Sequence, residues 1–278
     1  MPWYENRRGE RLWYEDQGTG CPLIFIHGWC MSSMVWKYQF EGFSGFSDSF
    51  RLLAPDLRGH GRSLGISGHL DFDGFVRDLV DFFEALGLSK VVLVGWSMGA
   101  QIAIQSIAEL SGRVAGMVLV SATPRFTASD DYPHALSGKE AVGMRLKVQR
   151  NTQRALSGFY SRLFAEDELE SHPAASEIKQ LLSSIAVPDT AAVLDALDAL
   201  AMTDMRHLLA SITIPTLIIN GAHDRICLPQ ASGYLKAHIP GASQVLFPQC
   251  GHAPFLTQSE RFNAEIYRFA RSVCEQNA

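Results

Sequence analysis

The sequence predicts an α/β fold: a mainly parallel central sheet with helices on both faces and a helical cap inserted between two strands. Two observations predict it. Short apolar runs of strand length alternate with stretches of helical periodicity through most of the 278 residues, which is typical of a parallel sheet covered on both faces. The alternation stops between Pro124 and Arg206, where several helical segments and no convincing strand follow one another.

The elements before the cap follow in a regular order. The first two strands, at 3–6 and 11–15, form a hairpin around Gly9. Buried strands follow at 23–27, 51–54 and 91–94, and another at 114–120. Residues 72–86 have apolar side chains at helical spacing and stop at Gly87, so we expect a helix there. A second helix is expected at 100–110.

The cap and the C-terminal elements complete the prediction. Prolines at 133, 173 and 188 interrupt the helical segments of residues 124–206, and an insertion of this size is most simply a cap over the carboxyl ends of the strands. Strands at 215–220 and 244–247 and a helix at 262–273 follow. The expected division is therefore a core of residues 1–123 and 207–278 with a cap of residues 124–206.

Composition limits the function classes. Hydrophobic residues are 47% and charged residues 19%, as in an ordinary globular domain, and a net charge of −5 gives no reason to expect nucleic acid. No apolar run reaches membrane-spanning length, and the first residues lack an apolar signal core. We expect a cytoplasmic protein with no membrane partner. The cysteines are odd in number and lack metal-ligand spacing, so we expect free thiols in a reducing compartment and no metal or cofactor: Cys21, Cys30, Cys227, Cys250 and Cys274.

The segment 95–99, Gly-Trp-Ser-Met-Gly, lies between an apolar strand and a helical segment. This context predicts a nucleophile elbow, in which a sharp turn exposes the hydroxyl of Ser97. A serine nucleophile needs a base, and the base needs an orienting acid. His252 follows the last strand and Asp224 follows the strand before it. All three side chains lie at carboxyl ends of strands, so we expect a Ser97–His252–Asp224 triad.

Other polar residues near these strands have different expected roles. Asp56 and His60 precede the serine and are expected to structure a loop, and His223 is expected in a turn. A serine at the elbow argues against the carboxylate nucleophile of dehalogenases and epoxide hydrolases. The oxyanion is expected on two backbone N–H groups, that of Met98 after the nucleophile and that of Trp29 in the loop after an early strand.

On these motifs the chain resembles the α/β-hydrolase family over almost its whole length. The matching segments are 27–28 (His-Gly), 56–63 (Asp-Leu-Arg-Gly-His-Gly-Arg-Ser), the elbow, the Asp224 turn and the His252 loop. Within the family it is most similar to the carboxylesterases that cleave pimeloyl-acyl-carrier-protein methyl ester in biotin synthesis. That narrower likeness rests on 27–29, 95–99, 251–255, 124–126, 131–133 and the cap residues Gln153, Arg154 and Phe159.

The resemblance implies a methyl ester substrate on an acyl chain carried by acyl carrier protein, an acidic partner. It places Trp29, Ser97, Met98 and Phe159 in the acyl site and Arg154 toward the carrier. Phe126 and Tyr160 are further candidates for that site, although Phe126, Phe159 and Tyr160 fit a cap core equally well. The sequence departs from the family at Gly158, where an arginine is usual.

Positive charge is nevertheless concentrated in the cap. Residues 141–165 carry five cations and no carboxylate on a chain that is acidic overall. Lys147, Arg150, Arg154 and Arg162 recur at near-helical spacing, and apolar side chains are expected on the opposite or adjoining side: Leu146, Leu156, Phe159, Leu163 and Phe164. A basic stripe can bind an acidic carrier, or it can be an ordinary solvated helix face.

The sequence therefore predicts a serine carboxylesterase that acts through an acyl-enzyme on Ser97. Two alternatives stay open: a general short-chain esterase without a carrier partner, and a ligand-sensing protein that keeps the fold and barely turns over.

Overall fold

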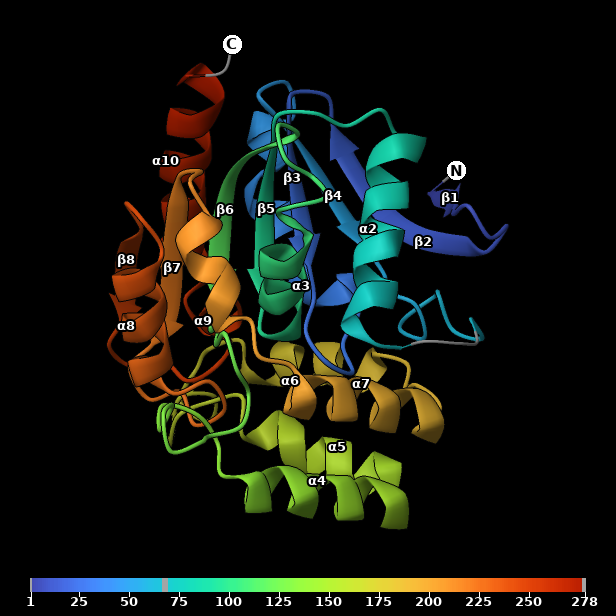
Figure 1. The fold of residues 1–278 in the computed structure, drawn as a ribbon, viewed down its shortest axis with the longest axis vertical. Coiled ribbons are helices and arrows are strands. Elements are labelled where there is room, and N and C mark those ends of the chain that lie inside the picture. Colours follow the sequence, from blue (N-terminus) through green and yellow to red (C-terminus); the bar gives the residue numbers. More distant parts are fainter. Residues whose placement is uncertain (1, 67–69, 277–278) are drawn as a thin grey trace.

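The computed structural model describes residues 2–66 and 70–276. Within these ranges the chain forms an eight-stranded sheet in the order β1-β2-β4-β3-β5-β6-β7-β8 (Figure 1). The hairpin of β1 (Trp3–Glu5) and β2 (Arg11–Gly18) pairs antiparallel with β4 (Phe50–Pro55). The other strands run parallel to β4: β3 (Cys21–Ile26), β5 (Val91–Trp96), β6 (Val114–Val120), β7 (Thr216–Gly221) and β8 (Ser243–Phe247). The predicted fold class is confirmed.

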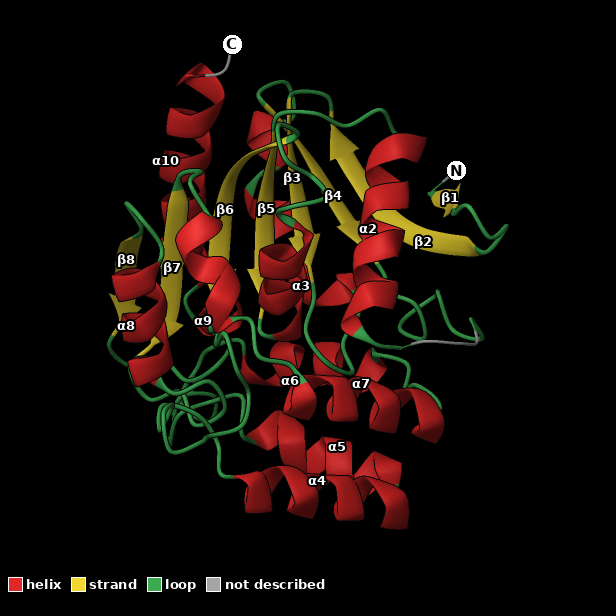
Figure 2. Cartoon of the chain, in the orientation of Figure 1, coloured by secondary structure: helices red, strands yellow, loops and turns green. Residues whose placement is uncertain are grey.

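Helices cover both faces of the sheet (Figure 2). α2 (Phe72–Ala85) and α3 (Met98–Ser106) pack together on one face, while α1 (Lys37–Gly42) and α10 (Ser259–Gln276) pack together on the other. The middle strands are therefore enclosed, and every residue of β5 is buried, which explains its unbroken apolar run. None of the helices in the described ranges is long and apolar enough to cross a membrane.

Several local signals set the boundaries of these elements. Asp71 caps α2 by accepting a hydrogen bond from the Gly74 N–H at 2.8 Å, and the left-handed Gly87 follows its end. α3 begins two residues earlier than expected. Short elements that the sequence did not reveal are α1, α8 (Pro229–His238), α9 (Pro254–Thr257) and the 3₁₀ turns η1 (Ser33–Trp36), η2 (Ser44–Phe46) and η3 (Arg206–Ser211).

Four helices lie between β6 and β7 in the sequence and form a separate layer at one end of the sheet (Figure 1). They are α4 (Gly138–Arg150), α5 (Thr152–Ser161), α6 (Ala175–Ser184) and α7 (Thr190–Met202). The arrows of β5 and β7 point toward this layer in Figure 1. The helices therefore face the carboxyl ends of the parallel strands.

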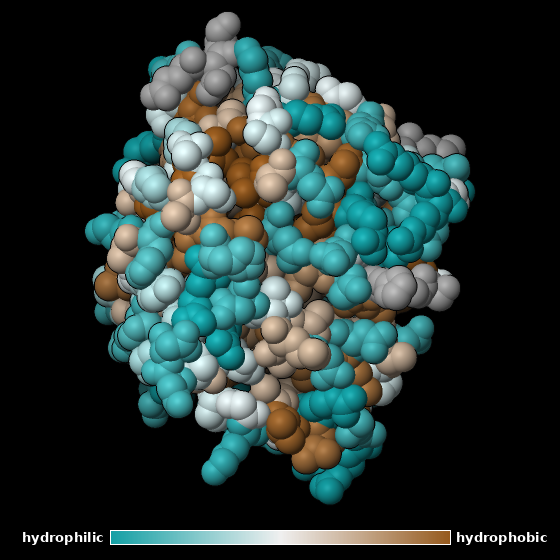
Figure 3. Space-filling model, in the orientation of Figure 1, coloured by the Kyte–Doolittle hydropathy of each residue, from teal (hydrophilic) through white to brown (hydrophobic). Residues whose placement is uncertain are grey.

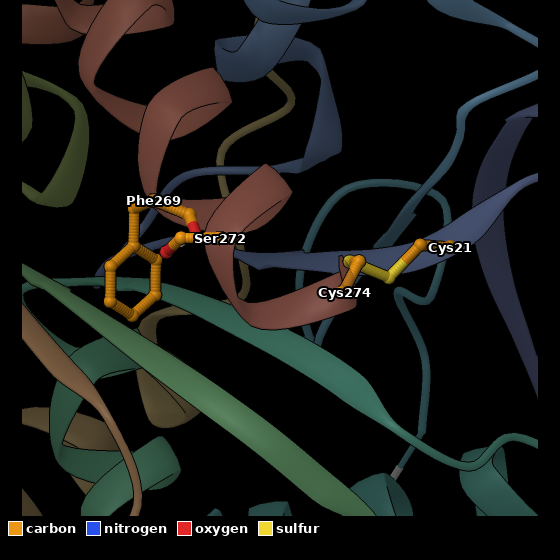
Figure 4. The surroundings of a disulfide bond; sticks show 4 residues. All are labelled: Cys21, Phe269, Ser272 and Cys274. Carbon is orange, nitrogen blue, oxygen red and sulfur yellow. Dashed lines mark hydrogen bonds between the residues drawn. A yellow bond between two sulfur atoms is a disulfide. The ribbon is translucent and has the colours of Figure 1, made fainter. Parts of the chain in front are cut away.

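A disulfide joins the first strand of the parallel sheet to the last helix (Figure 4). Cys21 opens β3 and Cys274 lies near the end of α10, 253 residues later. The expectation of free thiols is therefore wrong for this pair, because the fold brings two distant cysteines together. Cys30, Cys227 and Cys250 are free and buried. Disulfides are rare in a reducing cytoplasm, so the bond weighs against the cytoplasmic location, which stays a prediction.

Candidate active site

Ser97 forms a sharp turn between β5 and α3. Its backbone is left-handed, with φ +56° and ψ −114°, a conformation that costs a serine about 1–3 kcal/mol. A Cβ atom on Gly99 would overlap the carbonyl oxygen of Ile26, so only glycine lets the turn pass this close to β3. Ser97 is partly exposed while both of its neighbours are buried. The turn therefore has the geometry of a nucleophile elbow.

Asp224 and His252 form a buried pair at the same edge of the sheet. Asp224 follows β7, His252 follows β8, and both side chains are fully buried. His252 Nδ1 lies 2.8 Å from Asp224 Oδ2. The other oxygen, Oδ1, accepts hydrogen bonds from the N–H groups of Ile226 (2.8 Å) and Cys227 (3.0 Å). With the carboxylate fixed in this way, Nδ1 carries the proton and Nε2 is the basic nitrogen.

The basic nitrogen of His252 is free to take a proton. Nε2 is buried and has no hydrogen-bond partner among the described residues. The ring is held by Trp96, whose centroid is 5.4 Å away and whose Nε1 donates to the His252 carbonyl at 2.8 Å. No hydrogen bond of the described residues joins Nε2 to the Ser97 hydroxyl. Such bonds are often long in hydrolases without substrate and tighten when it binds.

The two residues expected to supply the oxyanion hole lie close to Ser97: Met98 directly follows it, and Trp29 lines the same pocket. Met98 is the first residue of α3, so its N–H has no acceptor within the helix. Trp29 lies in the loop after β3, which His27 fixes: His27 Nδ1 donates to the Gly28 carbonyl at 2.8 Å, and Nε2 accepts from the Leu57 N–H at 3.0 Å. Burial lowers the pKa of His27 to about 4, so the imidazole that holds this loop stays neutral.

Cysteine thiols lie near the site but do not compete as nucleophiles. Burial raises the pKa of the Cys30 thiol well above its usual range. Burial, reinforced by the Asp224 carboxylate, does the same to the pKa of the Cys227 thiol. Because the thiolate is the reactive form of cysteine, both sulfur atoms stay protonated and unreactive. No cluster of three or more His, Cys, Asp or Glu in the described part of the chain is placed to hold a metal ion.

A narrow apolar pocket lies above Ser97, between the sheet and the cap. Its free volume is about 30 Å³, room for one or two waters. Four expected substrate residues line it, and two do not. Met98 is fully buried, while the Tyr160 hydroxyl donates to the Cys30 carbonyl at 3.1 Å and the side chain lines a neighbouring groove. The lining residues are Trp29, Ser97, Phe126, Leu136, Glu140, Ala141, Met144, Phe159, Arg162, Leu197, Leu200 and Ile226.

A second, positively charged groove adjoins this pocket on the cap surface. Its volume is about 390 Å³, and Met144 and Arg162 line both cavities. Four of its eight lining residues are cations: Lys147, Arg150, Arg154 and Arg162. Gly158 also lines it, and a Cβ atom there would meet nothing within 4 Å. Neighbouring atoms therefore do not require glycine at the position where the family usually has an arginine.

The structure changes two details of the predicted basic stripe. The stripe does not follow one helix, because Asn151 ends α4 and caps α5 by accepting from the Arg154 N–H at 2.9 Å. Leu146 does not face inward. It is 59% exposed on α4 beside Val142, which is 58% exposed, and Figure 3 shows apolar side chains at the surface over this helix. The other four apolar residues, Leu156, Phe159, Leu163 and Phe164, are buried.

Two carboxylates near the site were missed by the sequence reasoning. Glu140 lines the apolar pocket and lies 3.8 Å from Arg162 at its rim. Glu168 contacts the loop that carries His252. Glu140 completes a capping box with Ser137, a local pattern that is visible in the sequence, but nothing local marks Glu168.

Comparison with known proteins identifies the family and shows several similar members. Residues 22–259 match the family described as alpha/beta hydrolase fold. A pimeloyl-[acyl-carrier protein] methyl ester esterase of Nitrosomonas europaea is 33% identical over 250 residues, covering 89% of this chain and 95% of that protein. The esterase of the same name from Nitrosospira multiformis is 29% identical over 262 residues, covering 94% and 98%.

Solved structures of esterases agree. An esterase from Exiguobacterium antarcticum superposes with a TM-score of 0.89 at 25% identity, over 97% of this chain and 98% of that one. A thermophilic esterase from Thermogutta terrifontis has a TM-score of 0.79 at 31% identity, over 95% and 94%.

Proposed function

This chain belongs to the α/β-hydrolase family and is a carboxylic ester hydrolase, and we propose that Ser97, His252 and Asp224 are its catalytic triad. One observation carries the proposal. The left-handed Ser97 turn and the buried His252–Asp224 pair lie at the ends of parallel strands β5, β7 and β8, at one edge of the sheet.

The reaction follows from these positions. His252 Nε2 takes the proton of the Ser97 hydroxyl as its oxygen attacks the ester carbonyl, and Asp224 stabilises the imidazolium that forms. The N–H groups of Trp29 and Met98 hold the oxyanion, a contribution of about 3–4 kcal/mol for each donor. His252 then protonates the leaving alcohol. A water, deprotonated by the same nitrogen, hydrolyses the acyl-enzyme and restores Ser97.

Replacing the nucleophile tests this mechanism. Ser97→Ala should lower kcat for p-nitrophenyl acetate by about 10⁴-fold or more, with an unchanged circular dichroism spectrum. A burst of p-nitrophenol from the wild type, equal to the enzyme concentration, would support an acyl-enzyme and exclude the ligand-sensing alternative. Near-native turnover in Ser97→Ala would contradict the triad.

For the substrate, we propose an acyl methyl ester presented by an acyl carrier protein, pimeloyl-acyl carrier protein in particular. The relatives' names support this choice. So does the basic groove, because a carrier with an acidic surface would bind its cations and direct an attached acyl chain past Met144 and Arg162 toward Ser97. The pocket's apolar walls suit the acyl chain.

Charge reversal in the basic groove tests the carrier. The double variant Arg150→Glu/Arg154→Glu should raise KM at least tenfold for pimeloyl-carrier methyl ester and leave KM for free methyl esters within twofold. Arg268→Glu, at a residue 66% exposed on α10, is the matched control and should change neither. Equal effects on both substrates would favour the short-chain esterase without a carrier partner, with which the small pocket also agrees.

A further inference from the structure

We infer that Glu168, a cap residue, is a positioning residue for His252, so that the cap supports the catalytic base as well as covering the pocket. The inference rests on the triad proposed above. Residues 163–168, here called the seat segment, follow α5 in the cap and run against the loop that carries His252.

Glu168 holds this loop on both sides of the histidine. Its Oε2 accepts hydrogen bonds from the N–H groups of Gly251, at 2.7 Å, and of Ala165, at 2.6 Å. Its Oε1 accepts from the Thr257 hydroxyl at 2.5 Å. Gly251 directly precedes His252, and Thr257 ends the short helix α9 that follows it. A single carboxylate therefore fixes the spacing between the two ends of the loop.

The backbones of the loop and the seat segment are also in direct contact. The His252 N–H donates to the Leu163 carbonyl at 2.7 Å. A Cβ atom on Gly251 would lie 2.7 Å from that carbonyl oxygen and 2.8 Å from the Ala165 nitrogen, which leaves no room for a side chain. Asp167, at φ +61°, turns the seat segment so that Glu168 reaches back to the loop.

Apart from these three donors, Glu168 contacts the Cys250 thiol of the same loop, whose pKa is raised by burial and by this carboxylate. Three donors satisfy its carboxylate, and no ion pair of the described residues includes it. On the core side the loop is held by Trp96, through the His252 carbonyl. His252 is thus held from the core by Trp96 and Asp224, and from the cap by the Leu163 carbonyl and, through the neighbouring residues, by Glu168. Loss of the Glu168 hydrogen bonds would allow the His252 imidazole to shift, and a misplacement near 1 Å can lower the rate about 100-fold.

Hydrolysis of p-nitrophenyl acetate by three variants tests the inference, because this small ester needs neither the carrier nor a long acyl site. Glu168→Ala should lower kcat about 10- to 100-fold with KM within twofold. Glu168→Gln should keep at least a third of kcat, since its amide oxygen can replace Oε2 and its NH₂ can donate to Thr257. Glu166→Ala, at a side chain 84% exposed in the same segment, is the matched control and should behave as wild type.

Stability and mechanism are separated by further variants. Cys274→Ser lacks the distant disulfide and serves as a destabilised control whose kcat should not change. If Glu168→Ala does not fold, Thr257→Val removes one of the three hydrogen bonds and should lower kcat severalfold at constant KM. Wild-type kcat in Glu168→Ala, or in Thr257→Val when that variant stands in, would overturn the inference. So would a Glu168→Gln variant as slow as Glu168→Ala, because charge rather than seating would then be responsible. Ser97→Ala reports separately on the triad: if it stays active, the proposed function fails whatever Glu168 does.

Discussion

Two buried histidines make the stability of this protein sensitive to acid. His27 and His60 are fully enclosed, with ring centroids 5.3 Å apart. Burial lowers the pKa of His27 to about 4, and burial together with the His27 ring lowers the pKa of His60 to about 3. In the unfolded chain both would titrate near pH 6.5. Below that pH the unfolded chain binds protons that the native state does not, so falling pH favours unfolding.

The size of the effect follows from the shifts. Each pH unit between the unfolded and the folded pKa costs about 1.4 kcal/mol. The contribution of His60 to the free energy of unfolding is fully present above pH 6.5 and is lost as the pH falls toward 3. Between pH 7 and pH 4, His60 alone should lower the free energy of unfolding by about 3 kcal/mol.

His60→Asn isolates this contribution. His60 Nδ1 lies 2.9 Å from the Arg58 carbonyl, and an asparagine amide can keep that donor while it cannot titrate. In urea unfolding at half-unit steps from pH 7 to pH 4, the variant should lose about 3 kcal/mol less than wild type. The carboxylates titrate in both proteins, so their contributions to the difference between the two pH curves cancel. Two pH curves that run parallel within about 1 kcal/mol would show that the native state protonates His60 about as readily as the unfolded chain does.

Three further changes follow from the structure. Cys274→Ser should lower the free energy of unfolding in urea by about 5 kcal/mol, because the disulfide closes a loop of 253 residues; no change on adding reductant to wild type would contradict this. Gly251→Ala should lower kcat for p-nitrophenyl acetate at least tenfold, since its methyl group would displace the seat segment; unchanged kcat would show that the backbone yields there. Phe159→Ala should widen the pocket and raise kcat/KM for p-nitrophenyl hexanoate relative to acetate; an unchanged ratio would mean that acyl chains bind elsewhere.

The sheet, and the placement of the three triad candidates at one edge of it, could be predicted from the sequence for one reason. In a parallel sheet, residues that directly follow strands lie at the same edge. Ser97, Asp224 and His252 each follow an apolar run, so local patterns were enough to bring together residues up to 155 positions apart. Expected strand boundaries differed from those observed by at most two residues, because the buried runs are sharply bounded; the exception is the partly exposed β2, which continues to Gly18, three residues beyond its expected end.

Features that depend on contacts between distant, irregular segments could not be predicted from the sequence. Glu168 is 83 residues from Gly251 and lies in a turn without periodicity. Cys21 and Cys274 have no spacing that distinguishes them from the three free cysteines. Leu146 was misplaced for a related reason: helical spacing gives the face on which a side chain lies, but the packing of α4 decides which face is buried.

The closed pocket indicates which part of the cap moves. A volume of about 30 Å³ cannot hold an acyl chain, so lining residues shift when substrate binds. The seat segment is hydrogen-bonded to the His252 loop through Leu163 and Glu168. The rim at α4 is tied instead by exposed ion pairs, Arg162 with Glu140 at 3.8 Å and Arg145 with Asp198 at 2.9 Å, each worth at most about 1 kcal/mol.

We therefore expect α4 to open while the seat segment keeps His252 in place. Amide hydrogen exchange should be at least tenfold faster in α4 than in residues 163–168, and slower exchange in α4 would assign the opening to the other end of the cap.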